Sequence, residues 1–133
     1  MSDTSGTPTV IHSLKVASEE VRPLEIEKVN YHDPTLILLG EGWSLAITCP
    51  WQVTDGQSRL FGWDDADVAG RALSLMDHAI TDVRERAKDA PYDPAFVLSG
   101  GLVLEIAADS DLDPWVLHLP TRTFVGFGPS ANK

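Results

Sequence analysis

Two stretches of this chain follow nearly the same pattern, sixty positions apart. They are "HDPTLILLGEGWSLAI" at 32–47 and "YDPAFVLSGGLVLEI" at 92–106. In each stretch, glycines that can adopt positive φ angles separate two apolar runs, which predicts a β-hairpin. A single hairpin has too few strands to bury a stable core. We therefore expect the two hairpins to belong to related halves that pack together.

The same pattern predicts which side chains face one another across each hairpin. We expect a three-residue loop at 40–42 and a two-glycine turn at 100–101. The expected cross-strand pairs are Leu39 with Trp43, Ile37 with Leu45 and Thr35 with Ile47, and then Ser99 with Leu102, Val97 with Leu104 and Ala95 with Ile106. Leu36 and Leu38 would point to the opposite face. Because the strand over 35–39 is apolar on both faces, we expect it to be central and covered on both sides.

The similarity extends beyond the hairpins. Each half is expected to contain a leading strand, a hairpin and a strand that begins with Pro-Trp, so that an internal repeat spans about 20–53 and 76–119. Trp51 and Trp115 each follow a proline at matching places. A tryptophan buries a large apolar surface, and its indole N–H usually finds a partner. We therefore expect Trp51, Trp115 and also Trp43 to be core residues with satisfied N–H groups.

The segment between the halves, "WDDADVAGRALSLMDHAITDVRERAKD" at 63–89, contains small and apolar residues at helical spacing. These residues are Ala69, Ala72, Leu73 and Met76. The spacing predicts a helix over 65–76. Asp64 or Asp65 is expected to cap its first turn, and Asp67 suits the positive end of the helix dipole.

The residues after this helix allow two interpretations. Ile80 and Val83 continue the helical period, which favours one long helix. The repeat aligns the same two residues with Ile26 and Val29 of the first half, which favours a strand. We follow the repeat and predict a strand over 79–87.

Taken together, these patterns predict a mainly β fold of the α+β class. We expect a single antiparallel β-rich domain, built from two related hairpin-containing halves joined by one short helix. Further strands are predicted at 9–16 and 24–31, where short apolar runs are bounded by Pro or Asp. The polar ends at 1–8 and 129–133 are expected to be tails, which places the domain at 9–128. A chain of 133 residues with 43% hydrophobic residues suffices for one core.

The charge of the chain limits its partners. Twenty acidic residues against ten basic ones give a formal net charge of −10. This charge opposes binding to nucleic-acid phosphates and favours a basic protein partner. The alternative is that the acidic residues only keep the protein in solution.

The composition also bears on location. No apolar run approaches the roughly 20 residues that span a bilayer. The N-terminus lacks the basic and apolar regions of a signal peptide, and Cys49 is the single cysteine. We therefore expect a cytoplasmic protein without disulfides.

Two motifs carry a resemblance to a known family. The first half closes with "LAITCPW" at 45–51 and the second with "LEIAADSDLDPW" at 104–115. In this the chain resembles a widespread family of small, uncharacterised bacterial β-rich proteins, over roughly residues 20–128. It departs from the family at 112–115, where the family often has Tyr-Glu-x-Trp, and at "GFGP", where the family has Pro-Gly-Gly. The family has no established enzymatic activity that the resemblance could carry over, and by analogy the resemblance implies an immunity-type or accessory role.

One group of residues leaves an enzyme as the alternative. "GWSLA" at 42–46 is similar to the nucleophile elbow of α/β-hydrolases, and Asp113 and His118 follow Ser44 in the order of that triad. An elbow requires a strand that leads directly into a helix, whereas Ser44 is predicted inside a hairpin strand. A small hydrolase or ligand-binding enzyme using these three residues is therefore the second hypothesis.

An acidic run near the end of the chain is partly similar to a calcium-binding loop. Asp109, Asp111 and Asp113 stand at its first three ligand positions. Pro114 stands where that loop needs glycine, and Pro120 where it needs glutamate. These departures favour a solvated acidic turn. The histidines and the lone cysteine show no metal-ligand spacing, and no glycine-rich nucleotide motif occurs, so we predict no metal and no cofactor.

The strongest candidate for a binding site lies at the start of the linker. In "RLFGWDDAD", Phe61 and Trp63 are followed at once by Asp64, Asp65 and Asp67. An aromatic anchor rimmed by carboxylates suits a partner that presents Arg or Lys. We predict these five residues as the partner-binding site; the alternative is that Trp63 only covers the helix against the sheet.

Overall fold

A computed structural model describes residues 10–87, 90–108, 114–120 and 122–126. The helical elements are α1 (Val10–Glu19), α2 (Val68–Ala72) and the 3₁₀ segments η1 (Leu73–Asp77) and η2 (Ser99–Gly101). The strands are β1 (Leu24–Glu25), β2 (Lys28–His32), β3 (Thr35–Gly40), β4 (Trp43–Ile47), β5 (Trp51–Thr54), β6 (Arg59–Gly62), β7 (Ala79–Ala87), β8 (Ala90–Leu98), β9 (Val103–Ile106), β10 (Trp115–His118) and β11 (Thr123–Val125). The predicted tails, 1–8 and 129–133, lie outside the described residues.

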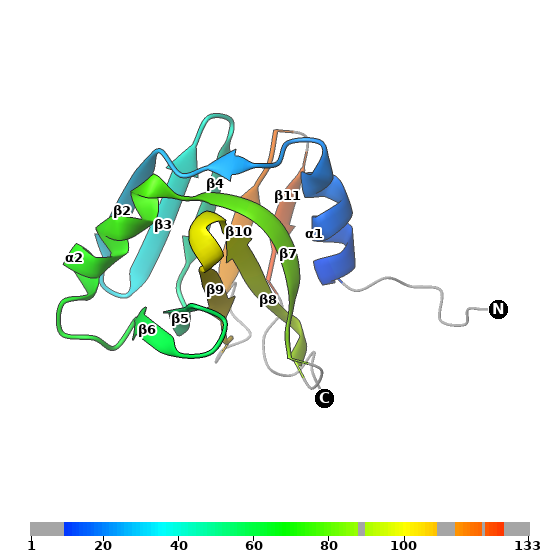
Figure 1. Cartoon of the computed structure of the whole chain (residues 1–133). Helices are drawn as coiled ribbons and strands as arrows, with labels where there is room; N and C mark the ends of the chain where they lie inside the picture. The colour runs from blue at the N-terminus through cyan, green and yellow to red at the C-terminus, as the bar shows by residue number, and fades with distance from the viewer. Residues whose placement is uncertain (1–9, 88–89, 109–113, 121, 127–133) are drawn as a thin grey trace.

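The strands form two antiparallel sheets that share one hydrophobic core. One sheet has the order β1-β7-β8-β9-β5-β6 and the other β11-β10-β4-β3-β2. Figure 1 shows α1 and α2 at opposite sides of the molecule, where α1 contacts β7 and β8, and α2 with η1 contacts β2. The prediction of a mainly β, antiparallel domain with two hairpins is confirmed.

The two halves exchange strands between the sheets. The chain forms β2, β3 and β4 in one sheet and then crosses to the other sheet for β5 and β6. It continues in that second sheet with β7, β8 and β9 and then crosses back to the first sheet for β10 and β11. Corresponding hydrogen bonds hold both crossings, from Thr48 N to Pro114 O at 2.9 Å and from Ala107 N to Pro50 O at 2.9 Å. Neither half can therefore complete a sheet without the other.

The predicted register of both hairpins is wrong by one residue. In the first, only Glu41 and Gly42 form the turn, with Gly42 at φ 79°, and Leu38 pairs with Leu45. In the second, three residues at 99–101 form the turn. The observed pairs that replace the predicted ones are Gly40 with Trp43, Leu36 with Ile47, Phe96 with Leu104 and Val97 with Val103. Successive side chains of a strand point to opposite faces of the sheet. A register shift of one residue therefore moves the side chains that faced the core to the solvent face, and the reverse.

This shift decides which side chains of β3 reach the core. Leu36 and Leu38 are fully buried, whereas Ile37 and Leu39 lie on the outer face and stay partly exposed. The central position of β3, between β2 and β4, is confirmed. The expectation that both of its faces are covered is wrong.

The strand predicted at 9–16 is a helix in the structure. Ile11, Leu14 and Ser18 are buried along one side of α1, at the spacing of three and four residues that a helix face requires. The period of two that marks a half-buried strand is absent from this run. The strand predicted over 79–87 is confirmed as β7, and the repeat over 20–53 and 76–119 stays a prediction.

An ion-pair network fastens α1 to β7. Arg22 Nη1 lies 2.8 Å from Asp82 Oδ1, and Lys15 Nζ lies 3.2 Å from the same oxygen. Burial raises the pKa of Asp82, but hydrogen bonds from the Val83 amide, Lys15 and Arg22 outweigh this effect and hold the pKa below its ordinary value. The folded state therefore favours the ionised carboxylate.

We expect Asp82→Asn to lower the free energy of unfolding near pH 7 by less than about 1 kcal/mol, because the side chain is 40% exposed and solvent screens the pair. A carboxyl group whose pKa is lowered by folding stabilises the folded state at pH values above its ordinary pKa. This stabilisation is lost as the pH falls through the pKa of the folded state. The difference between variant and wild type should then shrink as the pH is lowered from about 7 into the acidic range below the ordinary carboxyl pKa. Urea unfolding near pH 7 and in that acidic range measures it, and an equal difference under both conditions would contradict the assignment.

Three of the four tryptophans lie in the core. Trp43, Trp51 and Trp115 are 5%, 1% and 0% exposed, as predicted. Trp51 meets the ring of Phe61 edge to face, at 6.0 Å between centroids. Among the residues that the structure describes, the indole N–H groups of Trp51 and Trp115 have no hydrogen-bond partner, so the expectation of satisfied indoles is not met there for these two.

Candidate functional site

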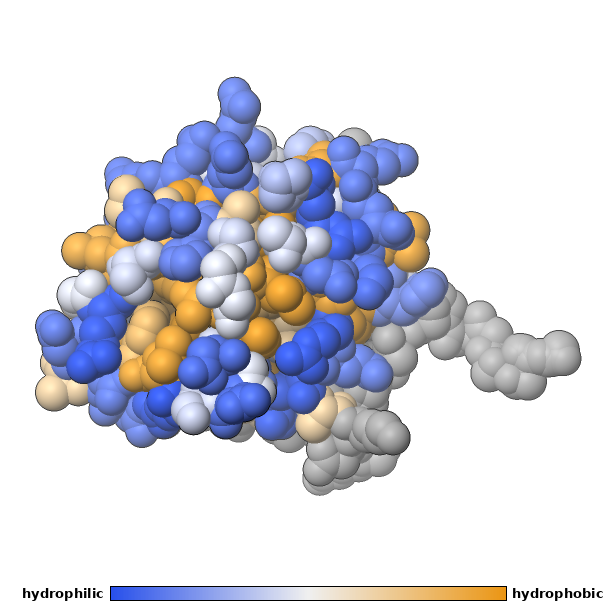
Figure 2. Space-filling view, viewed as in Figure 1, coloured by the Kyte–Doolittle hydropathy of each residue, from blue (hydrophilic) through white to orange (hydrophobic). Residues whose placement is uncertain are grey.

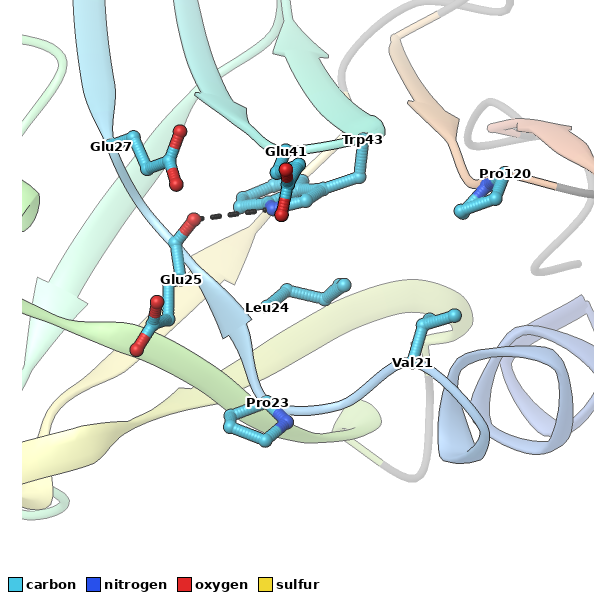
Figure 3. A pocket seen from close by; sticks show the side chains of 8 residues that line it. All are labelled: Val21, Pro23, Leu24, Glu25, Glu27, Glu41, Trp43 and Pro120. Carbon is cyan, nitrogen blue, oxygen red and sulfur yellow. Dashed lines mark hydrogen bonds between the residues drawn. The ribbon is translucent and has the colours of Figure 1, made fainter.

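One hollow of about 290 Å³ opens beside β1 and the β3–β4 turn (Figure 3). Its lining consists of Val21, Pro23, Leu24, Glu25, Glu27, Glu41, Trp43 and Pro120. The indole Nε1 of Trp43 donates a hydrogen bond to the backbone oxygen of Glu25 at 3.2 Å. Figure 3 shows Glu27 and Glu41 approaching the Trp43 indole from two different segments. The hollow therefore combines apolar walls with three carboxylates.

The turn that supplies Glu41 depends on the absence of a side chain at Gly40. A Cβ at this position would overlap the indole of Trp43 and the carbonyl oxygen of Glu25. Only glycine lets the end of β3 lie this close to the tryptophan. The close approach fixes Trp43 at the base of this hollow.

A second hollow, of about 370 Å³, lies beside Trp63, and we call it the Trp63 hollow. It is lined by Tyr31, Asp33, Trp63, Asp64, Asp65, Ala66, Asp67, Val68 and Ala69. Trp63 follows β6 directly, and its backbone N–H bonds the Trp51 oxygen at 3.1 Å. Its side chain is 48% exposed, in contrast to the other tryptophans. An indole held by its backbone but open to solvent can serve as an anchor for a partner.

Arg59 forms ion pairs with two of the aspartates that line this hollow. The guanidinium forms an ion pair with Asp64 and lies 3.7 Å from Asp65. The hydrogen bond from Arg59 is the largest cause that holds the pKa of Asp64 below its ordinary value. Asp65 Oδ2 also accepts a hydrogen bond from the Gly62 amide at 2.6 Å. Both aspartates therefore contribute to the local structure, although both lie near the surface.

The remaining carboxylates of the hollow come from two other elements. Asp33 Oδ1 accepts a hydrogen bond from the Tyr31 hydroxyl at 3.2 Å. Partial burial, this hydrogen bond and the charge of Asp33 raise the pKa of Tyr31, which stays a neutral donor. Asp67 precedes α2, and its side chain makes no capping hydrogen bond. With four carboxylates and one neighbouring guanidinium, the hollow is net negative.

The structure brings four of the five predicted site residues together and separates the fifth. Trp63, Asp64, Asp65 and Asp67 line one hollow. Phe61 does not line it, because its side chain is only 7% exposed and packs against the core tryptophan of β5. That these residues contact a partner stays a prediction. Tyr31 and Asp33 were not predicted. Their one signal in the sequence is the Asp-Pro pair that begins the first hairpin.

The predicted helix cap is also wrong. The helix begins at Val68, so that Asp67 and not Asp64 or Asp65 holds the cap position. Asp64 and Asp65 point back instead to Arg59 and to the amide of β6. Hydrogen bonding to the preceding strand thus outcompetes capping of the helix.

Two further hollows flank these sites. One, of about 680 Å³, shares Pro23, Glu25 and Glu27 with the hollow of Figure 3 and reaches Met76 and Asp77. The other, of about 210 Å³, lies on another side of Trp63. It is lined by Pro50, Trp51, Gln52, Trp63, Arg86, Glu105 and Ala107. Trp63 therefore forms part of the wall of two separate hollows.

The structure places two of the three residues of the hydrolase hypothesis side by side. Ser44 and His118 are direct cross-strand partners on β4 and β10, and both lie on the outer face of their sheet. His118 Nδ1 lies 2.8 Å from Thr123 Oγ1. Neither Ser44 nor His118 lines any of the four hollows above. Asp113 lies outside the described residues.

The acidic turn with Asp109, Asp111 and Asp113 lies outside the described residues. Elsewhere in the described ranges, no group of three or more His, Cys, Asp or Glu side chains has a geometry that could hold a metal ion. None of the helices in the described part of the chain has both the length and the apolar character to cross a membrane.

Comparison with known proteins adds no relative to this picture. No family model matches the chain, no curated protein matches it, and no solved structure matches it. The resemblance to small bacterial β-rich proteins therefore stays a prediction.

Proposed function

We propose that this chain is a non-catalytic cytoplasmic binding protein whose partner is a basic segment of another protein. One observation carries the proposal: the half-exposed indole of Trp63 stands in a hollow lined by four aspartates, of which two lie beside the guanidinium of Arg59. A role of the immunity or accessory type, in which the chain neutralises a basic protein, fits this arrangement.

The hollow supplies the two contributions that such binding needs. An indole face attracts a guanidinium or ammonium group through its quadrupole and also buries a large apolar area. The surrounding carboxylates steer a positively charged partner toward the indole and add charge-assisted hydrogen bonds. The net charge of −10 over the whole chain adds long-range attraction for the same class of partner.

The test begins with a pull-down from the source cell and compares wild type with the triple variant Asp64→Asn, Asp65→Asn, Asp67→Asn. Asparagine keeps a side-chain oxygen, so the acceptor for the Gly62 amide is preserved. We expect slower association and a flatter salt dependence, with the dissociation rate less affected, because rim charges act mainly on the association rate. Stopped-flow kinetics at several salt concentrations measure both effects.

A matched control removes the same charge elsewhere. Glu19, Glu20 and Glu85 are exposed and line none of the four hollows. Their replacement by glutamine should slow association less than the triple asparagine variant does. Equal effects of both variants would mean that only net charge matters, and no captured partner at all would contradict the proposed function.

A hydrolase is the second candidate, because Ser44 and His118 face each other across the ladder. Its test is labelling of the protein by a fluorophosphonate probe, which reacts with activated serines. Labelling that Ser44→Ala abolishes would support the hydrolase. Absence of labelling in the wild type would remove it.

A further inference from the structure

Exposed hydrophobic side chains concentrate in one part of the molecule. The large ones within the described residues are Val16, Leu60, Trp63, Leu73, Met76 and Val125. Four of these six lie between 60 and 77: Leu60 on β6, Trp63 directly after it, and Leu73 and Met76 on η1. Figure 2 shows hydrophobic side chains among hydrophilic ones on the face that carries α2 and β6. Such a concentration marks an interaction surface better than scattered single residues do.

The α2–η1 segment has a clear inner and outer side. Its buried residues are Val68, Ala72 and Leu75. Its other apolar residues, Ala69, Leu73 and Met76, are exposed, and we call them the outer ridge. Residues four apart in an α-helix, and three apart in a 3₁₀ helix, lie above one another. Of the four residues whose spacing predicted this helix, three therefore lie on its solvent-exposed side, and Ala72 alone is buried.

Each end of the outer ridge meets an acid-lined hollow. Ala69 belongs to the lining of the Trp63 hollow. Met76 belongs to the lining of the 680 Å³ hollow, together with Glu25, Glu27 and Asp77. The surface is thus an apolar strip with negative charge at both ends.

We propose that the outer ridge and its two hollows receive one amphipathic, basic α-helix of the partner, an inference that rests on the proposed function. The apolar face of that helix lies on the ridge, and one basic side chain enters each hollow. Charge complementarity at both ends selects a basic partner over a neutral one. A helix fits better than an added strand, because a helical ridge offers no free sheet edge, whereas helices pack ridge into groove.

The length of the whole α2–η1 segment, along which the ridge runs, sets the spacing of the two basic residues. Five residues of α-helix at 1.5 Å and five of 3₁₀ helix at 2.0 Å span about 17 Å. In the α-helix of the partner this distance corresponds to about eleven residues, or three turns. Basic residues with that separation, and apolar residues three and four apart between them, define the partner segment.

Two synthetic peptides of about 18 residues test this proposal by fluorescence anisotropy. Both have an apolar helical face and the same composition; the first has two lysines about eleven positions apart, and the second has them about four apart at one end. The ridge variant Leu73→Ser, Met76→Ser is compared with Val16→Ser, Val125→Ser, in which the exposed residues lie elsewhere. All four side chains are half-exposed, so both variants should fold.

The first peptide should bind wild type at least about tenfold more tightly than the ridge variant, and should bind the control variant within about twofold of wild type. Equal binding of the ridge variant and wild type would overturn the proposal, as would equal affinity for both peptides. If the Trp63→Ala variant alone loses binding, the ridge is refuted while the proposed function stands. If none of the variants and no change of lysine spacing alters the affinity, the ridge as a helix-binding surface and the proposed function are both refuted.

Discussion

Replacing Trp51 or Trp115 by alanine is expected to lower the free energy of unfolding by about 3–5 kcal/mol in each case. The two indoles are 1% and 0% exposed, so truncation removes a large buried apolar surface and leaves a cavity. Trp51 also pairs with Ile106, and Trp115 pairs with Ile47, so each tryptophan lies where a strand of one half joins the sheet of the other. Urea unfolding near pH 7 measures the loss.

The two losses should agree within about 1 kcal/mol if the tryptophans hold equivalent places in two related halves. Trp63→Ala is the matched control, because its half-exposed indole should contribute less than about 1 kcal/mol to the free energy of unfolding. Unchanged melting temperatures for both core variants would show that the repeat is an accident of composition.

The second large effect concerns binding. Trp63→Ala is expected to weaken the affinity for the basic partner at least about thirtyfold, which corresponds to about 2 kcal/mol. The reason is that the indole is the largest exposed apolar group at the site and lines two hollows at once. Isothermal titration with the captured partner measures the loss, and unfolding by urea shows that the fold is preserved.

A conservative variant separates the anchor from the charges around it. Trp63→Phe keeps an aromatic face and should retain most of the affinity that alanine loses. If Trp63→Ala binds the partner as tightly as wild type, the Trp63 hollow is not the binding site, whatever the acidic residues contribute.

The parts of the fold that the sequence predicts are those encoded locally. Glycines between apolar runs suffice to predict both hairpins, and alignment of the halves suffices to predict β7. The register was missed because it depends on whether Gly40 belongs to the turn or to β3, which the pattern leaves open. The exchange of β5 and β10 between sheets was missed because strand partners are chosen by tertiary packing and not by local pattern.

The same distinction between local pattern and tertiary packing applies to the candidate site. Trp63 and its aspartates were predicted because they are neighbours in the chain. Phe61 does not line the hollow because the alternation of side chains along β6 turns it inward, and that orientation depends on the pairing with β5. Tyr31 and Asp33 reach the hollow only because α2 packs on β2, a contact that no spacing in the sequence reveals.

Binding of a basic partner at the Trp63 hollow can be followed by the four indole N–H signals of the ¹⁵N-labelled protein while the peptide with widely spaced lysines is added. The Trp63 signal should shift most, because its indole alone among the four is exposed and lines the proposed site. The signals of Trp51 and Trp115 should stay in place, since both indoles are buried. A Trp63 signal that does not move when the peptide is bound would contradict the central claim that the Trp63 hollow is where a basic partner binds.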